Sequence, residues 1–361
     1  LKQRSNNGWG GQRGYLMRMV RKELMEKYGL DERTIDTGGL VVRTTFDEKM
    51  VNAGVEAVRN TLPRQGVPSR LQVAIATVDV RTGAVKAIYG GKDYVRVRQQ
   101  NAATMDTAQA GSTFKPFCLV AALRDGISLR SRFDGGSPRQ FDGLEKPVQN
   151  FKNQPFGYID LVTATAHSVH TVYIALNEEV GPRNTRRTAY EAGLPEGEGT
   201  RGLDNGLGNV LGSTSVHPID MASAYETFAA QGERHQRYVV KEVQWPNGDV
   251  RRHRDSFADQ EPAFDPDVMA DTVYAMQQVV QAPGGSGGYA RALGRPVAGK
   301  TGTSTDSKSA WFVGFTPQLS TSVAMFRLSK DGGEEAIPPF GGFGSITGGS
   351  FPVRIWTAYM K

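Results

Sequence analysis

The chain has 361 residues, of which 39% are hydrophobic and 22% are charged, as in a globular protein with a large buried core. It contains no run of about 18 uncharged apolar residues that could span a membrane, and its single cysteine excludes an internal disulfide. The net charge of +6 would suit an anionic partner, but the basic residues are spread along the chain without interleaved aromatic residues. We therefore expect no nucleic-acid binding.

Residues 1–65 are predicted to form a linker module of helix, strand and helix. The apolar residues between 14 and 28 recur at helical spacing, and residues 39–45 have the pattern of a strand. Asp47 is a predicted N-cap, and the apolar residues that follow it at helical spacing continue a second helix as far as Pro63. We expect this module to pack against the rest of the chain and against whatever precedes it.

Residues 66–361 are predicted to form one domain of mixed α+β type. Strands are expected within 71–90, where two apolar runs flank a glycine turn, and again within 296–327. Mostly helical patterns lie between them, from about 112 to 280, and a closing helix is expected at 351–360. This order predicts an antiparallel sheet built from both ends of the domain, covered by helices on both faces, with a mostly helical subdomain inserted.

Ser112 and Lys115 lie three residues apart, where Pro116 and the apolar residues after it predict the first turn of a helix beginning at Ser112. Residues at this spacing are neighbours on one helical face, so the lysine nitrogen is expected near the serine oxygen. A serine hydroxyl is a poor nucleophile until a base accepts its proton. A lysine is such a base only when burial or a neighbouring cation keeps it neutral. The pair therefore predicts a nucleophile with an adjacent base.

Two other short motifs accompany this pair. Ser168-Val169-His170 lies within a helix expected from about 159 to 180, and Lys300-Thr301-Gly302-Thr303 lies on a predicted strand. In this order, S-x-x-K, S-x-x and K-T-G are typical of the penicillin-recognising acyl-serine enzymes. The sequence resembles the transpeptidase domain of class A penicillin-binding proteins, and the likeness extends to further segments. These are Ala110–Phe117, Met221–Tyr225, Ala298–Thr303 and Ala310–Thr316, with Tyr28–Leu30 and Gly38–Leu40 in the predicted linker.

The resemblance implies a role for each catalytic side chain. Ser112 would attack a carbonyl carbon, and Lys115 would accept its proton. Ser168 would pass a proton between the lysine and the leaving amine. Lys300, which lies close by in the family, would keep Lys115 neutral and attract the carboxylate of the substrate.

The resemblance also implies how the substrate is held. The hydroxyls of Thr301 and Thr303 would bind the substrate carboxylate, and Gly302 would let the substrate lie along the strand like an added β-strand. The backbone N–H groups of Ser112 and Thr303 would form the oxyanion hole.

His170 departs from the family pattern, which usually has asparagine at this position. The asparagine amide contacts the peptide bond of the substrate and the catalytic lysine in that family. A neutral imidazole donates from one nitrogen and accepts at the other, and the ring is bulkier and can become protonated. We therefore expect His170 to bind substrate and to alter the affinity for β-lactams.

The resemblance implies the penicillin-binding protein transpeptidase or serine β-lactamase-like fold. The implied activity is a D,D-transpeptidase that cross-links peptidoglycan stem peptides through an acyl-enzyme on Ser112, with β-lactams acylating the same serine. A D,D-carboxypeptidase, and a β-lactam-binding sensor or inert module without turnover, stay open as alternatives, because the choice of acceptor depends on the shape of the groove. No cofactor and no metal are expected.

The expected location is the extracytoplasmic face of the bacterial cell membrane. Since the chain begins at Leu1 and has no signal peptide, we expect an upstream glycosyltransferase and membrane anchor.

Other patterns in the chain suggest competing functions. The segment 294–301 matches the phosphate-binding pattern G-x-x-x-x-G-K-T, but such a loop opens a helix, and here a strand pattern follows. His167 and His170 have no third ligand nearby in the sequence, which disfavours a zinc site. Glu191, the candidate for the hydrolytic base of a β-lactamase, is expected to end a helix exposed to water. The glycine-rich segment 284–288 is predicted to be a flexible loop.

Overall fold

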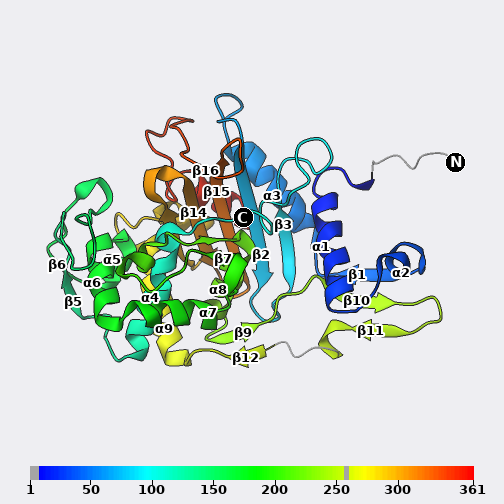
Figure 1. Ribbon diagram of the computed structural model, residues 1–361, viewed down its shortest axis with the longest axis horizontal. Coiled ribbons are helices and arrows are strands. Elements are labelled where there is room, and N and C mark those ends of the chain that lie inside the picture. The colour runs from blue at the N-terminus through cyan, green and yellow to red at the C-terminus, as the bar shows by residue number, and fades with distance from the viewer. Residues whose placement is uncertain (1–7, 256–259) are drawn as a thin grey trace.

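The computed structural model describes residues 8–255 and 260–361, and Figure 1 shows its elements in chain order. The N-terminal part contains α1 (Arg13–Glu26), α2 (Glu32–Thr37), β1 (Val41–Thr44) and α3 (Glu48–Thr61), which confirms the predicted helix, strand and helix and adds the short α2. As predicted, Asp47 caps α3, because its side chain accepts a hydrogen bond from Met50 N.

The N-terminal part is joined to the body of the chain through a small sheet. β1 pairs antiparallel with β10 (Val240–Gln244), which continues into β11 (Val250–Arg252). The predicted linker therefore shares a three-stranded sheet with a hairpin nearly 200 residues further along the chain.

The central sheet is built from both ends of the main part of the chain, as the sequence predicts. Its strand order is β13-β14-β15-β2-β3, with the short β16 paired to β15, and all neighbours are antiparallel. β15 and β2 lie side by side from the pair Leu319–Asp79 to the pair Arg327–Leu71. The strands are β2 (Leu71–Asp79), β3 (Val85–Tyr89), β13 (Ala298–Thr303), β14 (Ser309–Phe315), β15 (Leu319–Leu328) and β16 (Glu334–Glu335).

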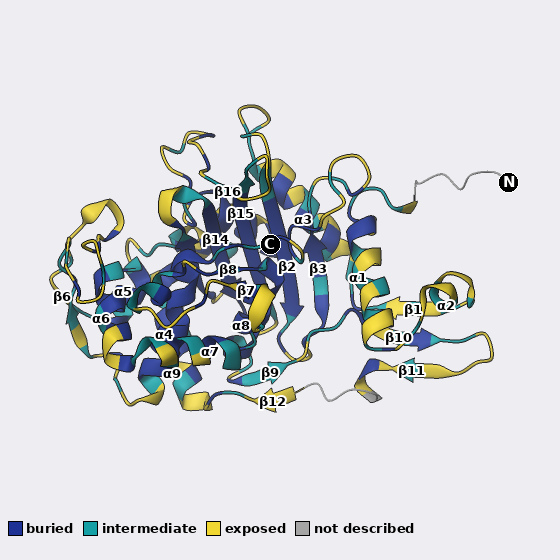
Figure 2. Cartoon of the chain, in the orientation of Figure 1, coloured by how far each residue is buried: buried dark blue, intermediate teal, exposed yellow. Residues whose placement is uncertain are grey.

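Helices cover both faces of this sheet, which confirms the predicted α+β class. β2 is buried on both sides because its apolar residues alternate between two cores: Ala74 and Ala76 belong to one, and Val73 and Ile75 to the other. The first core includes α8 (Pro218–Ala229), and the second includes α3 and α10 (Phe351–Met360). Figure 2 shows the strands of the central sheet as mostly buried.

A mostly helical part is inserted between β3 and β13, with a third hydrophobic core of its own. The single helix predicted from about 159 to 180 is wrong, since Ser168 has a left-handed backbone (φ 59°) that separates α5 from α6. The remaining elements are small sheets and helices of this part. They are β4 (Ala108–Gln109), α4 (Lys115–Arg124), β5 (Arg132–Asp134), β6 (Tyr158–Asp160), α5 (Leu161–His167), α6 (His170–Val180), α7 (Pro182–Glu191), β7 (Thr200–Arg201), β8 (Ser215–Val216), β9 (Glu233–His235), β12 (Gln260–Pro262) and α9 (Pro266–Gln281).

Across the two described stretches of the chain, every helix is too short or too polar to cross a bilayer.

Candidate active site

Ser112 lies at the start of α4, but not in the α-helix itself. It belongs to a tight 3₁₀ turn, Gly111–Phe114, and the α-helix begins at Lys115, which corrects the predicted start at Ser112. Gly111 has a positive φ of 55°, and a Cβ there would come within 2.7 Å of Thr303 O. Glycine is therefore needed where the turn of Ser112 presses against β13.

Ser168 lies between the two lysines predicted to be catalytic. Its left-handed backbone turns both its carbonyl and its hydroxyl oxygen toward Lys115, whose Nζ lies 2.7 Å from the carbonyl oxygen and 3.1 Å from Oγ. Lys300 Nζ donates to the same Oγ at 2.7 Å. A left-handed conformation is unfavourable for a residue with a Cβ, so this geometry is held by the surrounding contacts.

The expected contact between Ser112 and Lys115 is less direct than the spacing predicts. In the described part of the chain, no hydrogen bond joins Ser112 Oγ to Lys115 Nζ, and the lysine is bound by Ser168 instead. Hydrogen bonds between a nucleophile and its base are often long in a site without substrate. In this structure Ser168 is the shared partner of Lys115 and Lys300, and Ser112 lies one turn before Lys115.

Burial lowers the pKa of Lys115 and favours its neutral form. Both lysines are fully buried. Desolvation, followed by the positive charge of Lys300, lowers the pKa of Lys115 well below its ordinary value. Desolvation also lowers the pKa of Lys300, to about 7. Both buried lysines therefore lose their protons more readily than an exposed lysine.

The K-T-G strand presents its backbone to the same site. β13 is the edge strand of the central sheet, and Ser304 N donates to Ser309 O at 3.1 Å. Since successive residues of a strand direct their N–H groups to opposite sides, the N–H of Thr303 points away from β14 and toward the free edge. Ser112, at the start of a helical segment, has an N–H without an intrahelical acceptor. The two predicted oxyanion donors thus lie on elements in contact.

Gly302 has a reason in packing that the sequence interpretation missed. A Cβ at this position would lie 2.6 Å from Ala110 O and 2.8 Å from the side chain of Thr113. The missing side chain therefore lets β13 approach the turn of Ser112, in addition to the predicted role in binding substrate.

Comparison with known proteins places this geometry in a family. The family model described as penicillin binding protein transpeptidase domain matches residues 73–337. The chain belongs to the penicillin-binding protein transpeptidase family. It is 35% identical to Penicillin-binding protein 1A of Mycolicibacterium smegmatis over 97% of this chain, and 35% identical to that of Mycobacterium tuberculosis over 99%. The chain spans 45% and 44% of the lengths of these two relatives.

Solved structures agree with this assignment. The PonA1 protein from Mycobacterium tuberculosis in complex with penicillin V aligns with a TM-score of 0.84 and 32% identity, over 97% of this chain and 92% of that one. Penicillin-Binding Protein 1A from Haemophilus influenzae, at 19% identity and a TM-score of 0.82, has the same fold over 96% of this chain and 69% of that one.

His170, where the sequence departs from the pattern that the resemblance implies, begins α6 two residues after Ser168. Its Nδ1 lies 2.9 Å from Gln149 O, so Nδ1 carries the hydrogen and Nε2 of the neutral ring is an acceptor. Burial, followed by the positive charge of Lys115, lowers the pKa of His170 to about 3. The ring therefore stays neutral near physiological pH and becomes protonated only at low pH.

Ser286 is a site residue that the sequence interpretation missed. Thr301 Oγ1 donates to Ser286 Oγ at 2.8 Å, and Ser286 N donates to Ala166 O at 2.9 Å. The glycine-rich segment 284–288 therefore packs between α5 and β13, although it was predicted to be a flexible loop. A serine flanked by glycines shortly before the K-T-G strand is the signal that could have pointed to it.

The structure also bears on the three competing interpretations of the sequence. Lys300 and Thr301 lie on a strand and not at the start of a helix, which excludes a phosphate-binding loop. Residues 8–255 and 260–361 contain no group of three His, Cys, Asp or Glu that could hold a metal ion. Glu191 is bound by Arg124, at the opposite end of α4 from Lys115 and about 14 Å along the helix.

Proposed function

We propose that the chain is a serine D,D-transpeptidase domain that cross-links peptidoglycan stem peptides, and that β-lactams acylate it at Ser112. The observation that carries this proposal is the arrangement of Ser168 between Lys115 and Lys300, beside the turn that presents Ser112. Membership of the family and the penicillin V complex of PonA1 support it.

The acylation step follows from this arrangement. Ser112 Oγ attacks the carbonyl carbon of the penultimate D-alanine while neutral Lys115 accepts its proton. The negative charge that develops on the carbonyl oxygen is stabilised by the N–H groups of Ser112 and Thr303. The proton then moves through the hydroxyl of Ser168 to the nitrogen of the terminal D-alanine, which leaves as the C–N bond breaks.

The second step returns the enzyme to its starting state. The amine of a second stem peptide attacks the carbonyl carbon of the acyl-enzyme, and its proton is accepted by the Lys115–Ser168 pair. The ester bond to Ser112 breaks, and Ser112 Oγ recovers a proton. A new peptide bond between the two stem peptides remains.

We assign the substrate carboxylate to the part of the site that contains Lys300 and the two threonines of β13. Lys300 contributes a positive charge, and Thr301 and Thr303 contribute hydroxyls on the same strand. His170 contacts the acyl amide of the substrate as an acceptor through Nε2, which supports an altered affinity for β-lactams.

We further assign residues 1–65 to a linker module that connects an upstream glycosyltransferase to a transpeptidase domain of residues 66–361. The chain spans less than half of its curated relatives, which agrees with such an upstream part. The proposed location is the extracytoplasmic face of the bacterial membrane, through an anchor in that part.

Labelling with a fluorescent penicillin tests the proposal. A stable adduct of the expected intact mass should form, and peptide mapping should locate it on Ser112. Ser112→Ala should abolish labelling, whereas Ser128→Ala, at an exposed serine beyond the far end of α4, should label normally. An adduct that persists in folded Ser112→Ala refutes the assignment.

The choice of acceptor is tested with a pentapeptide glycan strand and an amine acceptor. Formation of a cross-linked dimer supports the transpeptidase. Release of a tetrapeptide without cross-linking would identify a carboxypeptidase, and a stable penicillin adduct without either product would identify a sensor.

A further inference from the structure

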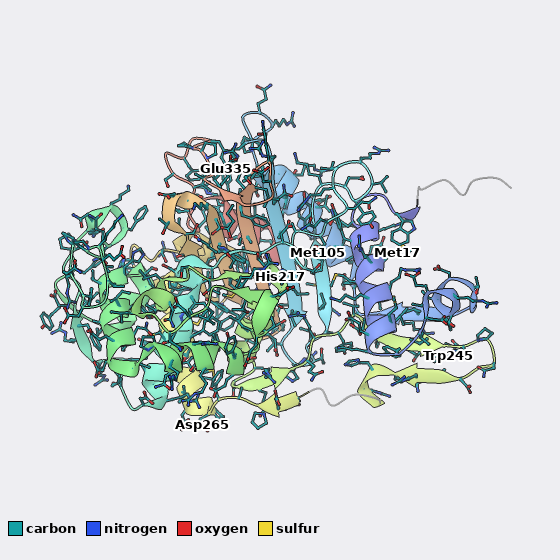
Figure 3. The ribbon with its side chains drawn as sticks, viewed as in Figure 1. Met17, Met105, His217, Trp245, Asp265 and Glu335 are labelled. Carbon is teal, nitrogen blue, oxygen red and sulfur yellow. The ribbon has the colours of Figure 1, made fainter. Side chains whose placement is uncertain are left out.

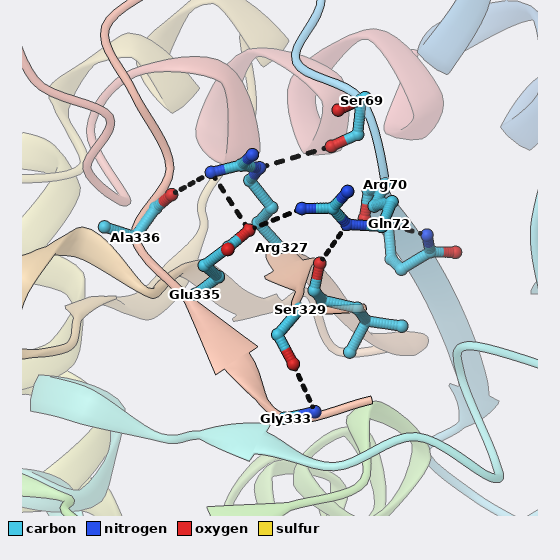
Figure 4. Close-up of polar contacts among 9 residues, drawn as sticks. Ser69, Arg70, Gln72, Arg327, Ser329, Gly333, Glu335 and Ala336 are labelled. Atoms are coloured by element: carbon cyan, nitrogen blue, oxygen red, sulfur yellow. Dashed lines mark hydrogen bonds and ion pairs between the residues drawn. The ribbon is translucent and has the colours of Figure 1, made fainter. Parts of the chain in front are cut away.

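The short hairpin of β15 and β16 ends in two neighbouring glutamates with different surroundings. Glu335 is held by two arginines: Arg70 Nη2 lies 2.8 Å from its carboxylate, and Arg327 Nη1 lies 3.2 Å from it. Arg70 also donates to Leu328 O at 2.8 Å. Figure 3 shows where Glu335 of β16 lies in the fold, and Figure 4 shows its arginine contacts in detail. The arginines therefore fix the hairpin in one position.

Glu334 points to the other side of β16, as neighbouring residues of a strand do. Its two carboxylate oxygens lie 3.1 and 3.3 Å from Gln109 N, and Ser215 Oγ donates to it at 2.9 Å. In the part of the chain that the structure describes, no lysine, arginine or histidine forms a salt bridge with Glu334. The charge of Glu334 is thus directed at a backbone N–H and a hydroxyl.

Gln109 lies three residues before Ser112 and is held on both sides. Its N–H is bound by Glu334, and its carbonyl oxygen accepts hydrogen bonds from Ser309 Oγ at 2.6 Å and from Trp311 Nε1 at 2.7 Å. Glu334 is therefore the charged side chain among the contacts that hold the backbone segment leading to Ser112.

The turn that follows leaves little space for displacement. Ala110 N and Gly111 N donate to backbone carbonyls at 2.8 and 2.9 Å. A Cβ at Gly212 would come within 2.0 Å of Gly111 O, so the backbones of the two glycines are in direct contact. A shift of Gln109 is thus transmitted to the turn of Ser112, because the residues between them are packed against fixed backbone.

We propose that Glu334 is a positioning residue for Ser112. By holding Gln109 N, it keeps the Ser112 N–H and hydroxyl aligned with Thr303 on β13. The effect on acylation rests on the proposed function, whereas the effect on the backbone of 109–112 does not. A misplacement of about 1 Å at the reacting groups can reduce a rate by about 100-fold, so for a smaller shift we expect Glu334→Ala to lower the saturating acylation rate by about 10-fold.

The matched control is Glu335→Gln, which removes the same charge from the neighbouring residue but leaves acceptors for the arginines. Stopped-flow kinetics with a fluorescent penicillin should give, for Glu334→Gln and Glu334→Ala, a lower saturating acylation rate with an unchanged dissociation constant of the non-covalent complex. Hydrogen exchange of the peptide 108–112 should become faster in both variants. Glu335→Gln should match the wild type within about twofold in both measurements.

Wild-type acylation by a folded Glu334→Ala variant overturns the proposal, and so does an equal loss of rate in Glu335→Gln. A slower rate with unchanged exchange in 108–112 also overturns it, because the backbone would not have moved. If Glu334→Ala fails to fold, the comparison of the two glutamine variants decides. If the wild type is not acylated at Ser112, the proposed function fails, while faster exchange confined to Glu334→Gln still supports the positioning role.

Discussion

Replacing His170 by asparagine should speed the acylation of Ser112 by benzylpenicillin. In the structure, His170 Nδ1 donates its hydrogen to Gln149 O at 2.9 Å, and the ring is neutral because its pKa is lowered to about 3 by burial and by the charge of Lys115. Nε2 therefore has no hydrogen to donate to the acyl amide carbonyl of a penicillin. An asparagine amide offers that donor.

The size of the effect follows from one hydrogen bond. A buried hydrogen bond is worth about 0.5 to 1.5 kcal/mol, which corresponds to a rate increase of about 2- to 13-fold if the bond is made in the transition state. The measurement is the second-order rate constant of acylation by benzylpenicillin. His167→Asn is the matched control, since His167 ends the neighbouring helix α5 outside the contacts of the two lysines, and it should leave the rate unchanged.

An equal or lower rate in a folded His170→Asn variant would show that the acceptor at Nε2 favours acylation. The inference that acylation is slowed because Nε2 carries no hydrogen would then be refuted. A rate increase of the same size in His167→Asn would point to a general effect on the helical part of the fold.

Three further predictions concern the same site. The acylation rate should rise with pH as Lys115 loses its proton. It should fall above about pH 7, because the pKa of Lys300 is lowered to about 7 and the neutral lysine no longer attracts the substrate carboxylate. A flat pH–rate profile would contradict this. The Ser168→Gly and Ser168→Ala variants should be acylated equally slowly. In denaturant unfolding the glycine variant should be more stable than the alanine variant by about 1 kcal/mol, because glycine adopts φ 59° without strain. Equal stabilities of the two variants would refute this. Ser286→Ala should slow acylation by benzylpenicillin about 2- to 10-fold, because Thr301 Oγ1 loses its hydrogen-bond partner, and it should slow acylation by benzylpenicillin methyl ester less. Ser286→Thr is the control, since it keeps a hydroxyl. Equal losses of rate for the acid and the ester would argue against a role at the carboxylate.

The features that the sequence predicted depend on residues close together in the chain. The burial of β2 on both faces follows from its nearly unbroken apolar run, and the cap of α3 follows from Asp47 just before the apolar residues at helical spacing in that helix. The S-x-x-K spacing predicted the pairing of Ser112 and Lys115 in one turn, although the turn is 3₁₀ and the lysine is bound by Ser168. The spacing of residues along the chain predicts on which side of a helix or strand a side chain lies. It does not predict which residue far away in the sequence contacts that side chain.

The contacts that complete the site are decided by the tertiary structure. Lys300 and Ser168 meet across 132 residues, and Gln109 and Glu334 across 225. The break of the predicted helix at Ser168 combines local and distant contacts. Ser168 N donates to Thr165 O at 3.2 Å in a left-handed cap of α5, while Lys115 binds the Ser168 carbonyl oxygen and Lys300 its hydroxyl oxygen. The sequence by itself therefore determined most of the elements and the chemical types of the side chains, whereas the tertiary structure decided which of those side chains lie within hydrogen-bond distance of one another.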